Sequence, residues 1–185
     1  MKNITKKVIL TITFILPATV FIFLKFFGTN RFDVPIFYEK SVDTSFTDCP
    51  EAKLPYYLAP PENSNQSLYS GSISILTFNF RNDENHAKEL QRICERYDSN
   101  EHVKILTLTD DDFKGCSENI VLSQEEFNSY LNCKLYTTEK NLAIVIDGIS
   151  RIRGYYNLQD RKETDRLFTE ISILEKNKEY ESGNK

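Results

Sequence analysis

The sequence predicts an α/β domain preceded by a single transmembrane helix, and three segments carry that prediction. Residues 8–27 are almost entirely apolar, which matches the roughly 20 residues that a helix needs to cross a bilayer core. Residues 72–108 place an amphipathic stripe between two runs of β-branched and aromatic residues, as in a β-α-β unit. Residues 141–157 (NLAIVIDGISRIRGYYN) set Asp147-Gly148 between two further β-type runs, which predicts a β-hairpin.

The amino-terminal run is expected to be an uncleaved membrane anchor over residues 1–28. Only Pro17 and Lys25 interrupt it, and a membrane helix tolerates both a proline kink and a lysine near its end. A cleaved signal peptide is the alternative, but no small-x-small cleavage site follows the run. Three lysines precede it, which favours a cytoplasmic amino terminus. We therefore expect a single-pass protein of the inner (cytoplasmic) membrane, with its carboxy-terminal domain on the periplasmic or extracytoplasmic side.

Residues 29–68 are expected to form a stalk between the anchor and the domain. Five of the six prolines fall between positions 33 and 61. The same stretch is rich in phenylalanine and tyrosine, whereas a free linker would be more polar. We therefore expect the stalk to pack against the domain or against the membrane surface.

Charge and cysteine content narrow the class of protein. Residues 1–27 hold four lysines and no acid, so the rest carries 19 basic against 27 acidic side chains, a formal charge of −8. An acidic domain repels nucleic acid, and no basic stripe with interleaved aromatic residues appears. Nucleic-acid binding is therefore excluded. The four cysteines would face an oxidising compartment on the outer side of the membrane.

The domain itself is expected over residues 69–176, with a charged tail at 177–185. Strands are predicted at 72–80 and 103–108, with a helix at 85–97 between them. Ser123 and Glu126 form a capping box that starts a short second helix. A last helix follows the hairpin and begins at a second capping signal; its predicted buried residues are Leu167, Phe168, Ile171 and Leu174.

The predicted order β-α-β, helix, hairpin, helix resembles that of thioredoxin-like proteins. Within them, the anchor, the segment NRFDVPIFY with a later DCP, and the hairpin block IDGISRIRGYYN resemble the Sco/SenC group of membrane-anchored copper and redox proteins. The resemblance extends from the anchor to about Leu174. It implies a copper site made by a CxxxC pair between the first core strand and its helix and by a His ahead of the hairpin, ligands that suit that metal.

All three of those ligands are missing here. The strand-to-helix junction, residues 80–86, reads FRNDENH and holds no sulfur, and residues 136–140 read YTTEK and hold no His. A thioredoxin-type oxidoreductase would need a CxxC at that junction and a cis-proline before the hairpin, but no proline follows Pro61. No functional residue is carried over, so we expect no catalytic residue, no metal and no cofactor.

The cysteines leave the redox question open. Cys94 lies on the apolar stripe of the first domain helix and is expected to be a reduced, buried core residue. Cys116 and Cys133 are the candidate disulfide pair, stapling the loop around the second helix. Cys49 could instead pair with either of them or stay free, and the sequence does not decide the connectivity.

His86, with Asp83 and Glu84 beside it, is a candidate for a displaced metal site. The acids also stabilise the start of a helix through its dipole, so we expect His86 to be an exposed first-turn residue. His102 is expected to be an isolated residue before a strand.

Two further sets of charged residues have both a structural and a functional interpretation. The triplet at 110–112, three aspartates at a strand end, is a candidate cation site, and we expect a solvated loop. Arg151 and Arg153 alternate on one face of the hairpin, where they could bind an anion or a partner's carboxylate. We expect them instead to lie on the solvated surface.

The sequence favours a membrane-tethered, Sco-like protein with a degenerate site. We expect it to act without catalysis, as an interaction or assembly factor for an unidentified envelope protein. The alternative is a thiol-disulfide redox protein that uses Cys116 and Cys133 as a relocated pair. A weak metal carrier based on His86 and nearby carboxylates is the third reading.

Overall fold

The computed structural model describes residues 2–27, 33–42, 49–62, 64–78, 83–109 and 118–182. The chain divides into two compact units, Met1–Phe32 and Asp33–Lys185. The aspartate triplet at 110–112, Cys116 and the first part of the strand-to-helix junction, residues 79–82, lie outside the described residues.

The first unit contains one helix, α1 (Lys2–Phe27), with Pro17 inside it. The Thr19 hydroxyl donates to the Ile15 carbonyl oxygen four residues earlier, at 2.5 Å. Large apolar side chains such as Leu10 and Phe14 are more than half exposed. In the part of the chain that can be described, no helix combines the length and the apolar character needed to cross a membrane, so the predicted transmembrane helix is not found.

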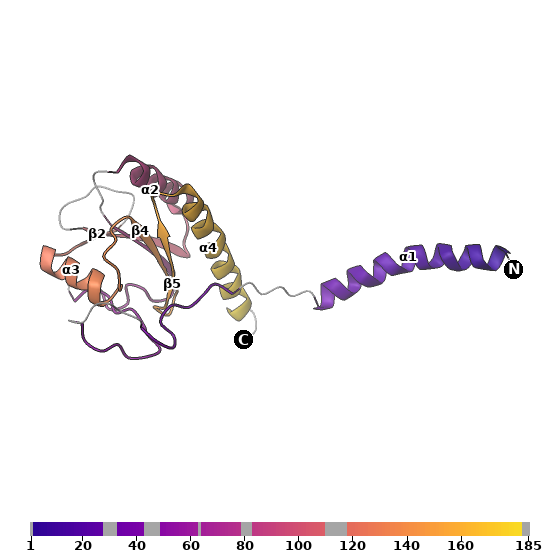
Figure 1. The fold of residues 1–185 in the computed structure, drawn as a ribbon, viewed down its shortest axis with the longest axis horizontal. Helices are drawn as coiled ribbons and strands as arrows, with labels where there is room; N and C mark the ends of the chain where they lie inside the picture. Colours follow the sequence, from indigo (N-terminus) through magenta and orange to yellow (C-terminus); the bar gives the residue numbers. More distant parts are fainter. Residues whose placement is uncertain are drawn as a thin grey trace. The chain divides into compact units, whose positions relative to one another are not determined.

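The second unit is built on one five-stranded mixed sheet (Figure 1). Its strands are β1 (Ile73–Phe78), β2 (Val103–Thr109), β3 (Glu118–Val121), β4 (Leu142–Ile146) and β5 (Ile152–Asn157), in the spatial order β3-β2-β1-β4-β5. Strands β1, β2 and β3 run parallel, whereas β4 is antiparallel to both β1 and β5. The predicted β-α-β unit and hairpin are confirmed.

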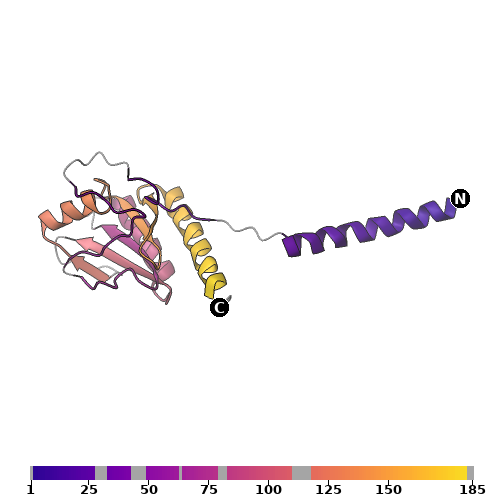
Figure 2. The same ribbon diagram turned by 90° about the horizontal axis from the view of Figure 1, so that it is seen from below.

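Helices cover both faces of the sheet, as the two views show (Figures 1 and 2). On one face, α2 (Glu84–Tyr97) and α4 (Arg161–Ser182) pack on the strands through Ile93, Leu167 and Ile171. On the other face, the short helix α3 (Gln124–Cys133) buries Phe127 and Leu131. The residues of the central strand β1 are all buried because both of its faces are covered.

An extended strap, residues 33–42 and 49–62, completes the cover that α3 leaves open. Tyr56 and Leu58 are buried in the same core as α3, and Val34 is buried in the other core. Of the two predicted packings, against the domain or against the membrane surface, the structure shows the first. The compact unit begins at Asp33 rather than at residue 69, because the strap supplies part of the core.

Capping side chains set the residues at which α3 and the last helix, α4, begin. Ser123 and Glu126 form the predicted capping box, with both reciprocal hydrogen bonds present. Before α4, the Asp160 side chain accepts the backbone N–H of Lys162 at 2.9 Å. The four residues predicted to be buried on this helix are buried, and the helix continues to Ser182, beyond the predicted end near residue 176.

The hairpin differs from its prediction at the turn. The register shifts between Val145 and Ile146, and the loop spans residues 147–151 rather than two residues. Asp147 holds this loop, because its Oδ1 accepts the N–H groups of Ile149 at 3.1 Å and Arg151 at 3.0 Å. Ser150, at φ 68°, adopts the left-handed conformation that closes the loop.

Candidate functional site

The candidate site lies where β1 ends and α2 begins. Asp83 is the N-cap of α2: its Oδ1 accepts the backbone N–H of Asn85 at 2.8 Å and of His86 at 3.2 Å. Its Oδ2 accepts a hydrogen bond from the Gln159 side chain. The bond from Gln159 and then the one from the His86 N–H hold the pKa of the Asp83 carboxyl below its usual value. This carboxylate therefore stays ionised and serves the helix start.

Three amide side chains continue the hydrogen bonding from Asp83 to the adjoining ends of β4 and β5. Asn141, just before β4, donates from Nδ2 to Asn157 Oδ1 and to Gln159 Oε1, both at 2.9 Å. The Gln159 backbone N–H donates to Asn157 Oδ1, also at 2.9 Å. We call Asp83, Asn141, Asn157 and Gln159 the strand-end network. Sequence reasoning missed its three amides, although polar residues directly flanking β4 and β5 were a signal for them.

His86 is buried, with 2% of its surface exposed, so the predicted exposed position is wrong. The first turn of α2 faces the sheet, and burial lowers the pKa of the imidazole. Hydrogen bonding to the Phe78 backbone and the nearby Asp83 carboxylate oppose that shift without cancelling it. The neutral imidazole is thus a packed part of the helix–sheet contact.

The acids near His86 do not gather into a metal site. Glu84 is exposed and pairs with Lys88 at 2.8 Å. Within the described ranges, no group of three or more His, Cys, Asp or Glu side chains could hold a metal ion. His102 is exposed before β2.

The segment ahead of the hairpin, where the resembling family has its His, is aromatic here. Tyr136 lies edge-on to Tyr38 and Tyr56, with ring centroids 5.1 and 5.3 Å away. The Lys140 ammonium lies 5.0 Å from the centroid of the Phe127 ring. Tyr155 donates to the Leu135 carbonyl oxygen at 2.9 Å. These contacts join the strap, α3 and the pre-hairpin segment into one packed surface.

Two further tyrosines form a hydrogen-bonded pair beneath the strap. The hydroxyl oxygens of Tyr69 and Tyr130 are 2.9 Å apart, and Tyr130 donates to the Ala59 carbonyl oxygen at 2.8 Å. Burial raises the pKa of Tyr69 to about 12 and that of Tyr130 well above its usual value. Both hydroxyls therefore remain protonated and act as fixed hydrogen-bonding groups.

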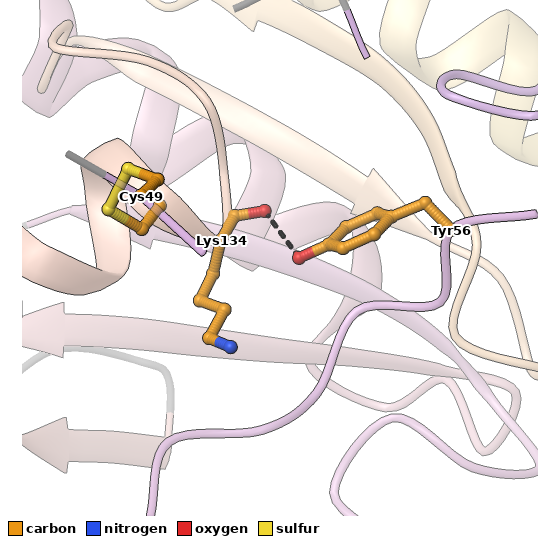
Figure 3. Close-up of a disulfide and its surroundings, with 4 residues drawn as sticks. Cys49, Tyr56 and Lys134 are labelled. Atoms are coloured by element: carbon orange, nitrogen blue, oxygen red, sulfur yellow. Dashed lines mark hydrogen bonds between the residues drawn. A yellow bond between two sulfur atoms is a disulfide. The ribbon is translucent and has the colours of Figure 1, made fainter. Parts of the chain in front are cut away.

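Cys133 is bonded to Cys49, which lies 84 positions earlier in the sequence. Figure 3 shows this disulfide near the end of α3, beside the bond from the Tyr56 hydroxyl to the Lys134 carbonyl oxygen at 2.9 Å. The predicted Cys116–Cys133 pair is therefore not formed; the strap brings Cys49 to Cys133 instead. Cys94 is buried as predicted, but it is disulfide-bonded rather than reduced. None of the cysteines that the structure describes is a free thiol.

The hairpin arginines serve the domain rather than a ligand. Arg153 is buried, with 7% of its surface exposed. It donates from Nη1 to Asp147 Oδ2 at 3.0 Å, and from Nη2 and Nε to the carbonyl oxygens of Val34 at 2.6 Å and Pro35 at 3.1 Å. Arg151 Nε also donates to Asp147 Oδ2, at 2.8 Å. The surface position predicted for Arg153 is wrong because the strap covers this side of β5.

Comparison with known proteins supplies fold neighbours only. No family model and no curated protein matches the chain. Solved structures that resemble it include BsSco, a member of the Sco family of cytochrome c oxidase assembly proteins, at 14% identity and a TM-score of 0.47, covering 65% of this chain and 91% of that one. A proposed protein disulfide isomerase from Bacteroides thetaiotaomicron matches at 15% identity and a TM-score of 0.47, covering 64% and 87%. A SCO1/SenC family lipoprotein from Bacillus anthracis matches at 11% identity and a TM-score of 0.43, covering 57% and 83%. The chain has an α/β fold built on a five-stranded mixed sheet, and the solved structures that resemble it include Sco/SenC proteins.

Proposed function

We propose that this chain is a non-catalytic, Sco-like protein of the cell envelope, tethered to the membrane by its amino-terminal unit. It acts by contacting other envelope proteins, as an interaction or assembly factor. The single observation that carries the proposal is the strand-end network, where the hydrogen-bonding groups of the candidate site are used to hold the domain together.

A catalytic or ligand-binding site keeps polar groups directed at its substrate. In the strand-end network, both oxygens of Asp83 accept hydrogen bonds from the chain itself, and the amides of Asn141 and Gln159 bond to their neighbours. His86 is buried under the helix start. This arrangement favours a structural role for the position at which the resembling family carries its ligands.

The state of the cysteines supports the same proposal. A thiol-disulfide enzyme needs an exchangeable pair in an accessible, electropositive setting. Cys133 instead closes a long-range bridge to Cys49 in the strap. Stable disulfides are typical of oxidising compartments, which supports a position of the domain outside the cytoplasm.

Membrane tethering rests on residues 1–28. Three lysines precede an apolar run whose exposed side chains include Leu10, Phe14 and Phe21. Such side chains gain free energy on burial in lipid.

A redox and metal assay tests the absence of catalysis. The full chain, solubilised in detergent, should reduce the disulfides of insulin no faster than the added dithiothreitol alone, and it should not compete with a Cu(I) chelator. Thioredoxin serves as the positive control. Turnover above background that disappears in a Cys49→Ser, Cys133→Ser double variant would contradict the proposal and identify this pair as the redox centre.

Cross-linking tests the contact with other envelope proteins. Glu84 and Glu139 are exposed side chains near the strand ends, so a photo-reactive residue at either position should give cross-links to envelope proteins in intact cells. Lys104, exposed on β2, provides a comparison position. Cross-links absent from all positions would contradict an interaction role.

A further inference from the structure

We propose that one edge of the domain docks on the lipid surface through three exposed apolar side chains, Phe37, Tyr57 and Ile149, here called the apolar rim. This inference rests on the proposed membrane tether and adds an orientation to it. Tyr57 is 52% exposed and Ile149 is 57% exposed, although both belong to segments that pack against the core.

The three side chains come from segments joined by backbone hydrogen bonds. The Phe37 N–H donates to the Ile152 carbonyl oxygen at 2.9 Å, and the Leu58 N–H donates to the Ser150 carbonyl oxygen at 2.8 Å. The strap therefore runs beside the hairpin loop and β5 on both of its passes. Phe37 makes one of these bonds, and Tyr57 and Ile149 directly precede the two residues of the other, which brings all three to the same edge of the domain.

The outward direction of Tyr57 follows from its neighbours. Tyr56 and Leu58 are buried in the core, so the residue between them in the extended strap points away from it. Phe37 packs edge-on against Tyr155, with ring centroids 5.1 Å apart, and still keeps about a third of its surface exposed. Aromatic side chains with one apolar and one polar end are typical of the membrane–water interface.

The rim also lies where the strap begins. Ile149 lines a groove of about 640 Å³ together with Asp33 and Ile36, the first residues of the second unit. Asp33 is the residue at which the chain enters the second unit from the amino-terminal unit. The rim is therefore next to the point of the domain that is covalently joined to the proposed tether.

The charges on this edge favour an apolar rather than an electrostatic contact. The described part of the strap carries four acids, Asp33, Glu39, Glu51 and Glu62, against Lys40 and Lys53. This small acidic excess gives the edge no net attraction to anionic lipid. The binding should therefore depend little on salt or on lipid charge.

Tryptophan fluorescence in brominated vesicles provides the test, because the chain contains no tryptophan. Single variants Tyr57→Trp and Ile149→Trp report on the rim. Val121→Trp is the matched control: Val121 is 54% exposed on β3, at the opposite edge of the sheet. Phe14→Trp reports separately on the tether. Each full-length variant is reconstituted into vesicles of phosphatidylcholine and phosphatidylglycerol, with and without bromine on the acyl chains.

The proposal predicts bromine quenching and a blue-shifted emission at positions 57 and 149, at low and high salt, with neither change at position 121. Quenching at 14 without quenching at 57 and 149 would refute the docking and leave the tether intact. No quenching at 14 would refute the tether, and the docking with it. Equal quenching at 121 and 149, or quenching at 149 that high salt abolishes, would also refute the proposed surface. A blue shift at 149 that grows with protein concentration in detergent would assign the rim to a second copy of the chain instead.

Discussion

Removing the Cys49–Cys133 bridge should destabilise the domain by several kcal/mol while leaving its secondary structure in place. The bridge joins the strap to the end of α3. No β-ladder connects these two segments, and the sheet is formed by other residues. The loss should therefore come mainly from the greater freedom of the unfolded chain.

The size of the effect follows from the separation of the two cysteines. They lie 84 residues apart in sequence, and closing a loop of that length stabilises a fold by roughly 4.6 kcal/mol in the chain-entropy model. A second disulfide at Cys94 can already shorten the free loop, so a loss of about 3–5 kcal/mol is expected. That is a large fraction of the stability of an ordinary domain.

Urea unfolding of the Cys49→Ser, Cys133→Ser double variant measures this loss. The double variant avoids the unpaired thiol that either single substitution would leave, and it leaves the bond at Cys94 in place. Near-ultraviolet circular dichroism follows the tyrosine packing beneath the strap. A variant as stable as the parent would refute a structural bridge. Full loss of the folded sheet in water would also contradict the reasoning, because the loss of stability would then exceed the entropy of one closed loop.

Three further substitutions test other contacts. Arg153→Met should cost about 3–5 kcal/mol of unfolding free energy, because it leaves the buried Asp147 carboxylate without that partner; part of the loss should return on adding Asp147→Asn. His86→Phe should reduce acid sensitivity. Burial lowers the pKa of this imidazole in the folded state, so its neutral form stabilises the fold fully above about pH 6.5, and that stability is lost as the pH falls from there toward the folded pKa. Urea midpoints at pH 7.5 and 5 should converge in the His86→Phe variant, but not when the exposed His102 is replaced. Gly154→Ala should cost about 1–3 kcal/mol, because its Cβ would overlap the ring of the tyrosine two residues later, whereas Gly148→Ala meets only ordinary contacts; thermal melts compare the two.

The sequence predicted the elements whose signals are local. The capping box at Ser123, the apolar stripe of α2 and the β-branched and apolar runs of β4 and β5 each lie within a few residues, and all three correspond to observed elements. Hydrophobic periodicity reports burial against an unspecified partner. It therefore identified the buried face of α4, but on α2 it missed the burial of His86 and Glu89.

The errors concern contacts between distant segments. The burial of Arg153 depends on carbonyl groups in the strap, 118 and 119 residues earlier in the chain. The choice of Cys49 as the partner of Cys133 depends on the path of the same strap. A stretch rich in proline and aromatic residues looks the same in sequence whether it links two units or covers a core. Similarly, the acids Asp83 and Glu84 were consistent with a helix start at this point, but did not predict that the first turn of α2 would bury His86 against the sheet.

Thiol trapping in living cells tests the absence of redox catalysis most directly. Cells are quenched in acid, free thiols are alkylated, and the chain is mapped as peptides without reduction. The account predicts stoichiometric Cys49–Cys133 linkage and no alkylation of Cys94, unchanged when the cells are briefly exposed to a reductant too mild to unfold the protein. A fraction of Cys49 or Cys133 found as a free thiol, or in a mixed disulfide with another protein, would contradict it and identify the bridge as a working redox pair.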